Sequence, residues 1–142
     1  MEENIYIDAN IFILAAIDET KIGLKAKSFL RSIINKNLKA FTSTLPFDEL
    51  AYKVLKTRNK DDALEVISAF FNISNLSFIN VKENIVWNAF ELIKEYNLYP
   101  RDSIHAACAM SKEIKTIISE DKDFDKIKEL KKLSLEKMKT IP

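Results

Sequence analysis

Two hydrophobic patterns alternate along the chain. Short, almost wholly apolar runs predict buried β-strands, and segments with an apolar residue every three or four positions predict amphipathic helices. The predicted strands are residues 4–8, 39–42, 77–81, 115–119 and 133–135. The predicted helices are residues 11–18, 21–37, 45–57, 60–74, 83–97, 100–113 and 123–130.

Strands that alternate with helices predict βαβ units, in which helices cover a parallel sheet on both faces. No Pro-, Gly- or Ser-rich stretch divides the chain, and 142 residues fit one domain, so we predict a single α/β domain over residues 1–142. Ligands of such folds bind beyond the carboxyl ends of the strands. Asp8 and Asp121 follow the first and fourth strands, so both are expected at this edge.

The composition adds limits on the setting and the partners. With Cys108 as the only cysteine, the chain cannot form an internal disulfide, which favours a reducing compartment. No apolar run approaches the roughly 18 residues of a membrane span, so we expect a cytoplasmic protein with no membrane contact. The net charge of +1 does not by itself indicate a nucleic-acid binder, and any such binding would need local basic patches.

Asp8 closes an otherwise apolar strand. A carboxylate at such a position is costly unless it is paired, hydrogen-bonded or bound to a cation. It could also be an ordinary helix cap, because Asp8 or Asn10 is well suited to start the next helix.

Asp102 stands just inside a helix that begins at Pro100, where a carboxylate is common for reasons of helix stability alone. Its helix face favours a second role. By helical spacing, that face also carries His105, Ala106 and Ala109. Because the alanines allow close packing, we predict that this face and Asp102 point inward.

The other acids have weaker support from pattern alone. Glu49 is predicted to point into solvent, away from the apolar face of its helix, and the adjacent Asp48 competes with it. That apolar face consists of Phe47, Leu50, Ala51 and Val54. After the fourth strand, Asp121, Asp123 and Asp125 form an acidic run, a feature most often found in solvated loops.

Carboxylates from separate segments that meet at one edge repel one another and therefore need a cation. Oxygen ligands favour Mg²⁺ or Mn²⁺. One Cys and one His rule out a zinc site of the Cys/His type. The chemistry that fits such a centre is hydrolysis of phosphodiester bonds.

Three blocks of sequence resemble one known family. The blocks are IYIDANIFILAA (Ile5–Ala16), TSTLPFDELAYKVLK (Thr42–Lys56) and LYPRDSIHAACAM (Leu98–Met110), the last followed by TIISEDKDF (Thr116–Phe124). Each fragment is weak, but in this order they resemble the PIN domain, and within it the toxin ribonucleases of VapBC type.

The resemblance implies a three-layer α/β/α sandwich with a central parallel sheet, and Mg²⁺- or Mn²⁺-dependent cleavage of RNA by an endoribonuclease. It implies a catalytic, metal-binding set of Asp8, Glu49, Asp102 and Asp121. Asn10 and Ser119 take supporting positions. It also implies a homodimer and, for a toxin, a small antitoxin protein as partner. A housekeeping RNA-processing nuclease remains an alternative.

Several other side chains carry two interpretations. We predict that His105 is a buried, hydrogen-bonded helix residue and not a general base. Lys53, Lys56 and Arg58 are candidate RNA contacts or an ordinary solvated face. The apolar face of residues 63–71, and Trp87, are expected in the core or at a dimer contact.

Two other function classes stay open from the sequence. A PIN-like module could bind RNA or protein without cutting it. A phospho-aspartate phosphatase or receiver domain also places an Asp after the first strand, but the phosphatase pattern has a second Asp where this chain has Asn10. The receiver pattern needs an early acidic pair that is missing here.

Overall fold

The centre of the fold is a parallel sheet, seen in the computed structural model, which describes residues 4–35 and 39–138. From one edge to the other the strands follow the order β3 (Leu76–Ile79), β2 (Ala40–Ser43), β1 (Ile5–Ile7), β4 (Thr116–Ile118) and β5 (Lys131–Leu133). The strand order therefore reverses between β1 and β4. In parallel sheets, the crevice for a ligand opens at this switch point, outside the carboxyl ends of the strands.

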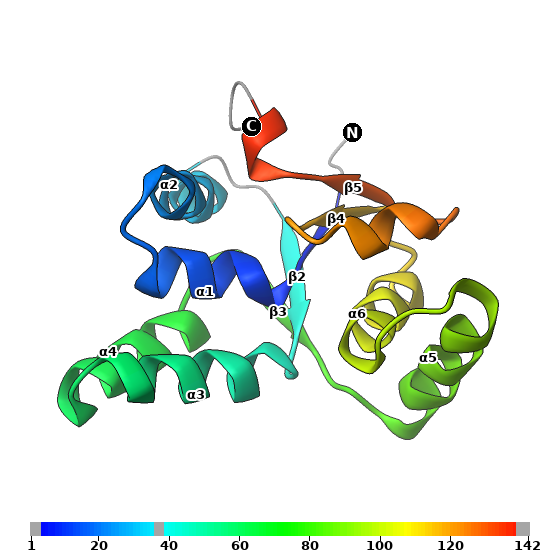
Figure 1. Cartoon of the computed structure of the whole chain (residues 1–142), viewed down its shortest axis with the longest axis horizontal. Coiled ribbons are helices and arrows are strands. Elements are labelled where there is room, and N and C mark those ends of the chain that lie inside the picture. The colour runs from blue at the N-terminus through cyan, green and yellow to red at the C-terminus, as the bar shows by residue number, and fades with distance from the viewer. Residues whose placement is uncertain (1–3, 36–38, 139–142) are drawn as a thin grey trace.

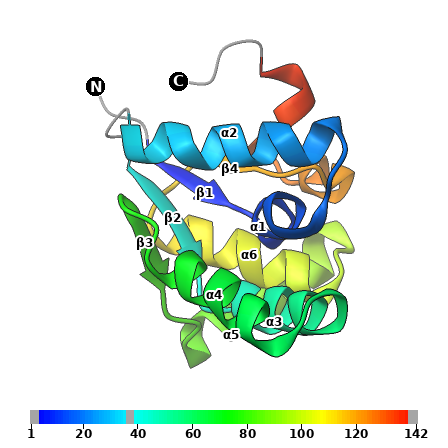
Figure 2. The same ribbon diagram turned by 90° about the vertical axis from the view of Figure 1, so that its left-hand side faces the viewer.

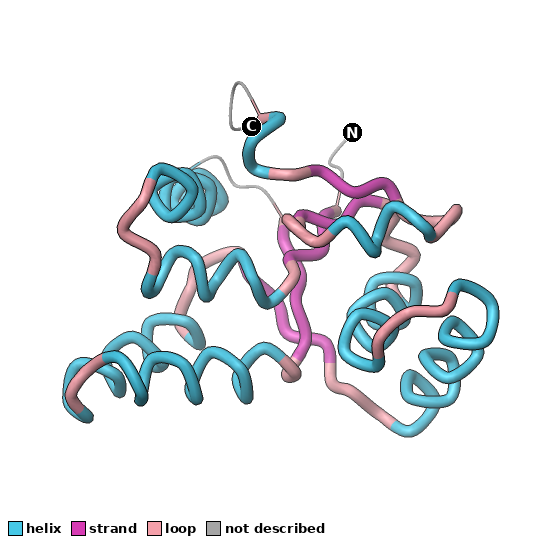
Figure 3. Tube along the Cα trace, in the orientation of Figure 1, coloured by secondary structure: helices cyan, strands magenta, loops and turns pink. Residues whose placement is uncertain are grey.

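Helices cover both faces of the sheet, as predicted (Figure 1; Figure 3). One face carries α1 (Ala9–Ile17), α2 (Lys21–Asn35), α3 (Pro46–Thr57) and α4 (Lys60–Phe71), and this is the face turned to the viewer in Figure 2. The other face carries α5 (Glu83–Tyr96) and α6 (Pro100–Ser111), which pack on each other. No helix within the described residues is long and apolar enough to cross a membrane.

Strand β1 shows why the sequence builds two cores. Its side chains alternate between the faces of the sheet. Ile5 and Ile7 pack into the core under α1 to α4, whereas Tyr6 packs into the core under α5 and α6. All three are buried. A strand buried on both faces reads as a continuous apolar run, which is the pattern that predicts it.

The single glycine of the chain allows a close approach between two helices. Gly23 lies in the first turn of α2, and a Cβ at this position would clash with the backbone carbonyl of Asp18, the C-cap residue of α1. Asp18 also accepts a hydrogen bond from the backbone N–H of Thr20, at 2.7 Å. The tight α1–α2 connection therefore needs a residue without a side chain at position 23.

The structure corrects two predicted boundaries. The helix predicted over residues 60–74 ends at Phe71, because the chain turns into β3 through Asn75, which has the left-handed φ of 66°. The strand predicted at residues 133–135 is β5, two residues earlier. Leu135 is a core residue, but it opens the short 3₁₀ turn η2 (Leu135–Lys137). Leu133 and Leu135 are apolar and two positions apart, which is the spacing of a strand, although only Leu133 belongs to β5.

Two further predictions are corrected, one extends beyond the described residues, and one is narrowed. The helix predicted at 123–130 is the 3₁₀ turn η1 (Lys122–Lys126), and residues 36 and 37 of the predicted helix 21–37 lie outside the described residues. Phe47, placed on the apolar face of α3, is 45% exposed and contacts the Phe71 ring. Trp87 is 60% exposed, which excludes the core and leaves the other predicted location, a dimer contact, as a prediction.

Candidate metal centre

Asp8 accepts two hydrogen bonds at the carboxyl end of β1 and lies close to an imidazole. Its Oδ1 accepts the backbone N–H of Ala9 at 2.7 Å, which caps α1, and its Oδ2 accepts the hydroxyl of Ser119 at 2.7 Å. The Nε2 atom of His105 lies 3.4 Å from Oδ1. Asp8 is only 5% exposed, and this burial, more than the nearby Asp121 carboxylate, raises its pKa to about 6. Asp8 is thus both a helix cap and a buried carboxylate of the site.

Ser119 joins three segments of the site because β4 pairs with β1 in a register that sets Ile118 beside Ile7. Besides donating to Asp8, its oxygen accepts the backbone N–H of Asp121 at 3.0 Å and the Asn10 amide at 3.4 Å. The carbonyl oxygen of that Asn10 amide is buried without a hydrogen-bond partner among the described residues. A buried acceptor without a partner is costly, which suits an atom whose partner is a bound water or ion.

The second group of acids is a cluster in which three carboxylates come together. Oxygens of Asp102, Asp121 and Asp123 lie within 4.8 Å of one another, and all three residues are half-buried. Burial, followed by the nearby charges of Asp121 and Asp8, raises the pKa of Asp102 to about 7. The carboxylates therefore resist ionising together, and a hard divalent cation would relieve the repulsion. The donor set fits Mg²⁺ or Mn²⁺.

A hydrogen bond within the loop after β4 fixes the positions of Asp121 and Asp123. The side chain of Asp121 accepts the backbone N–H of Asp123 at 2.9 Å and so caps η1. This tight turn points both carboxylates towards α6. The resemblance implies Asp121 and not Asp123 for the site, whereas the structure brings both carboxylates to Asp102.

Asp102 reaches the cluster from the first turn of α6. The predicted inward face of this helix is confirmed, since His105, Ala106 and Ala109 are all at most 2% exposed. The alanines let α6 lie close to the sheet, and this packing brings the start of the helix to the strand ends.

Glu49 lies outside the cluster of three. Its carboxylate is 3.8 Å from the Lys53 ammonium and 3.7 Å from the Arg101 guanidinium, with 30% of the side chain exposed. Arg101 also contacts Asp48 at 3.2 Å. These side chains, with Tyr52, line a hollow of about 320 Å³. Glu49 is therefore a rim residue linked to the site by Arg101, the neighbour of Asp102.

His105 is buried and hydrogen-bonded, as predicted. It is 2% exposed, and its Nδ1 lies 2.7 Å from the hydroxyl of Tyr6. Burial lowers the pKa of its imidazole to about 4, so the ring is neutral at physiological pH.

Pattern reasoning missed Tyr6 and Arg101 as neighbours of the acids. A signal for Tyr6 existed, because a residue two positions before Asp8 faces the same side of the strand. For Arg101 the signal was weaker, since contact with Glu49 depends on how α3 and α6 are placed.

With this geometry in view, comparison with known proteins identifies the family. A family model described as PIN domain matches residues 5–130. The chain belongs to the PIN domain family. The phospho-aspartate alternatives are thereby set aside.

Relatives of this PIN domain extend along almost its whole length. Ribonuclease VapC2 of Methanocaldococcus jannaschii is 25% identical over 146 aligned positions, which cover 89% of this chain and 91% of the relative. In structure, the chain is similar to VapBC2 from Rickettsia felis bound to a promoter DNA fragment, with a TM-score of 0.72 and 20% identity. The match covers 92% of this chain and 98% of that one. It is also similar to VapC20 of Mycobacterium tuberculosis, a toxin that cleaves the sarcin–ricin loop, with a TM-score of 0.70, 15% identity, and coverage of 85% and 92%. These likenesses confirm the predicted α/β/α fold.

Proposed function

We propose that this PIN domain is a Mg²⁺- or Mn²⁺-dependent endoribonuclease and that it is the toxin of a toxin–antitoxin pair. The observation that carries the proposal is the meeting of Asp102, Asp121 and Asp123 within 4.8 Å, beside the buried Asp8 at the switch point of the sheet. The relative from Methanocaldococcus jannaschii is named a ribonuclease, which supports RNA as the substrate.

In this proposal each acid has its own part. Asp102 and Asp121, with Asp123, hold the cation, and Asp8 faces it as an oriented carboxylate fixed by Ser119. Such a cation, when bound, activates a water and stabilises the leaving oxygen of the phosphodiester. Glu49 completes the set from the rim, directly or through a water.

The basic residues near the site are proposed to position RNA through its phosphates, without reading its sequence. Lys53 lies beside Glu49, and Lys56 follows one turn later on α3. Arg58 follows the last residue of α3, and would contact only an RNA that extends along the helix.

The test of the activity is cleavage of RNA by the purified chain with Mn²⁺, with Mg²⁺ and with EDTA. We expect the two cations to support cleavage and EDTA to abolish it. Asp8→Asn should reduce cleavage at least about 100-fold with an unchanged circular dichroism spectrum, since even groups that only support metal ligands contribute 10–100-fold. Glu65→Gln, which changes an exposed acid of α4, is the matched control. Unchanged activity in Asp8→Asn would overturn the assignment, and RNA binding without cleavage would favour a binding module.

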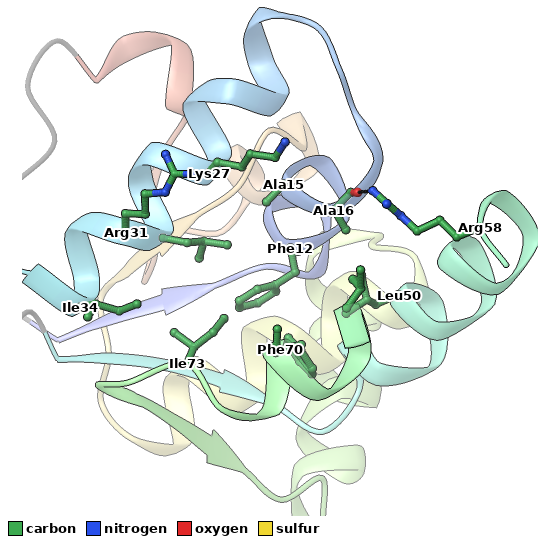
Figure 4. Close-up of a pocket in the computed structure, with 13 residues that line it drawn as sticks. Phe12, Ala15, Ala16, Lys27, Arg31, Ile34, Leu50, Arg58, Phe70 and Ile73 are labelled. Atoms are coloured by element: carbon green, nitrogen blue, oxygen red, sulfur yellow. Dashed lines mark hydrogen bonds between the residues drawn. The ribbon is translucent and has the colours of Figure 1, made fainter. Parts of the chain in front are cut away.

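An apolar groove supports the proposal of an antitoxin partner. It has a volume of about 350 Å³ and lies among α1 to α4, with Phe12, Leu30 and Ile73 among the side chains that line it (Figure 4). Lys27, Arg31 and Arg58 stand at its rim. Apolar walls with a basic rim fit an amphipathic segment that carries acidic residues. Solved relatives include a toxin–antitoxin complex from Klebsiella pneumoniae.

Expression in a bacterial host would test the toxin role. We expect the chain to arrest growth and the product of a small neighbouring gene to relieve the arrest. Arg31→Glu should weaken this relief without reducing toxicity, whereas Lys21→Glu, on the same helix but outside the groove, should not. Cleavage in vitro without growth arrest would favour the RNA-processing alternative.

We also propose that the chain forms a homodimer through α5. Val86, Trp87 and Phe90 are 47%, 60% and 50% exposed on the side of α5 away from its buried residues. A stripe of large apolar side chains of this kind commonly marks a protein contact. Light scattering should show a dimer that Trp87→Glu converts to a monomer, with Leu24→Glu, an equally exposed change on α2, as control.

A further inference from the structure

Three buried polar side chains form a row that ends at the metal centre. The hydroxyl of Tyr6 lies 2.7 Å from His105 Nδ1, and His105 Nε2 lies 3.4 Å from Asp8 Oδ1. The three residues are 0%, 2% and 5% exposed. Tyr6 and Asp8 are two residues apart along β1, so they point to the same side of the sheet, where α6 inserts the imidazole between them.

The chemistry of the three groups sets the direction of their hydrogen bonds. A carboxylate only accepts hydrogen bonds, so Nε2, the ring nitrogen that lies 3.4 Å from Asp8 Oδ1, is the one that carries a proton. A ring buried this completely carries no second proton, which leaves Nδ1 to accept the hydroxyl of Tyr6 at 2.7 Å.

On this basis we propose that His105 is a positioning residue for Asp8. The Nε2 proton holds the Asp8 carboxylate, together with Ala9 and Ser119, and Tyr6 holds the ring in the tautomer that makes this contact. The contact of 3.4 Å is slightly longer than a hydrogen bond, and such contacts often tighten when a site is loaded. The inference rests on the proposed metal-dependent function.

The geometry does not suit His105 for proton transfer to a substrate. Both ring nitrogens face protein groups, and the ring is almost wholly buried. Its value is in orientation, because partners that hold a metal ligand typically contribute 10–100-fold to metal affinity. One helix then serves the site twice, through Asp102 as a ligand and, one turn later, through His105 as the support of another acid.

The first test reads the tautomer directly. The chain has one histidine, so a long-range ¹H–¹⁵N spectrum contains a single imidazole. We expect protonated Nε2 and unprotonated Nδ1 in the wild-type chain at neutral pH. Tyr6→Phe should shift this balance, since Nδ1 loses its donor. A proton on Nδ1 in the wild-type chain would overturn the proposal.

The second test measures Mn²⁺ affinity by calorimetry, apart from any cleavage. His105→Leu should weaken binding about 10–100-fold. His105→Gln should keep most of the affinity, because its amide nitrogen reaches about as far as Nε2 and can still donate to Asp8. Leu92→Ala, a core truncation on α5 away from the row, should lower the melting temperature without lowering the affinity.

Two outcomes would overturn the positioning role: equal losses of affinity in His105→Leu and His105→Gln, or wild-type affinity in both. A wild-type chain that binds Mn²⁺ but cleaves no RNA would refute the proposed activity while leaving this inference intact. A wild-type chain that binds no Mn²⁺ would overturn both.

Discussion

Asp8 and Asp102 belong to one site, yet the protein balances their charges in different ways. Asp8 accepts hydrogen bonds from a backbone N–H and a serine hydroxyl, and it lies 3.4 Å from an imidazole nitrogen. Asp102 faces other carboxylates, and they raise its pKa beyond the effect of burial. One acid is held by the protein itself, whereas the other is left with a repulsion that the protein does not relieve.

The difference suggests a division of work between the two halves of the site. The half around Asp8 is ordered before any cation arrives, since its hydrogen bonds join β1, β4 and α1. In the half around Asp102, the three acids gain most from a cation, because their mutual repulsion then becomes attraction to a common charge. This separation can be tested acid by acid.

Asp102→Asn should give the largest effect. We expect Mn²⁺-dependent cleavage to fall at least about 100-fold, because the change removes a ligand and not merely a support. The same change should raise the melting temperature of the metal-free chain at pH 8 by about 2–4 °C, because it removes like-charge repulsion. Scanning fluorimetry in EDTA reads the second effect. A lower melting temperature would contradict the view that Asp102 is uncompensated.

Ser119→Ala should act in the opposite direction on stability. The buried Asp8 carboxylate would lose a donor, which lowers the free energy of unfolding by about 1–3 kcal/mol. Mn²⁺ affinity should fall about 10-fold, as for other supports of metal ligands. Ser134→Ala, at another buried serine outside the site, provides the control. If removal of the Ser119 hydroxyl increased the stability, the Asp8 half of the site would not be stabilised by its donors, and the proposed difference between the two halves would be wrong.

Much of this arrangement could be predicted from the sequence, for physical reasons that differ between residues. Asp8 and Asp121 follow apolar runs, and parallel strands bring their carboxyl ends to one edge. Asp102 was predicted to point inward by the alanines that share its helix face. These signals lie within a single element or in the order of elements, so a linear pattern contains them.

Other features depend on contacts between elements, which a linear pattern does not contain. The periodicity of α3 correctly excluded Glu49 from the apolar face. It could not predict that Arg101 from α6 pairs with Glu49. The contact of Tyr6 with His105 joins residues 99 positions apart. The predicted boundaries were wrong where apolar residues continue beyond the end of an element. Ile73 follows α4 in this way, and Leu135 follows β5.

The pH dependence of the metal-free chain offers a smaller test of the comparison. Asp8 and Asp102 have folded pKa values of about 6 and 7, above the unfolded value of about 3.8. Their contribution to stability is complete below pH 4 and is lost as the pH rises through 6 and 7. The folded pKa of His105 is lowered to about 4, so its contribution is lost as the pH falls below 6.5 and opposes the acids only there.

Above pH 6.5 the effect of the acids is therefore seen alone. We expect the melting temperature in EDTA to fall by about 2–3 °C between pH 6.5 and 8, a value discounted for the partial exposure of Asp102. Added Mn²⁺ should reverse the fall at pH 8. In Asp102→Asn the slope should be shallower, and an unchanged slope would show that the titrating group lies elsewhere.

The smallest expected effect concerns the acidic run after β4. Asp123→Asn should weaken Mn²⁺ binding by about 3–5-fold, less than a change at Asp102, because a water can replace one carboxylate oxygen around such a cation. Asp125→Asn is the matched control, since Asp125 is exposed and lies 3.5 Å from the Lys132 ammonium, away from the cluster. Asp121→Asn preserves the cap of η1, because asparagine also caps well, and therefore tests the charge alone. If Asp123→Asn and Asp125→Asn bind Mn²⁺ equally well, the cation is held by Asp102 and Asp121 without a third carboxylate from this loop.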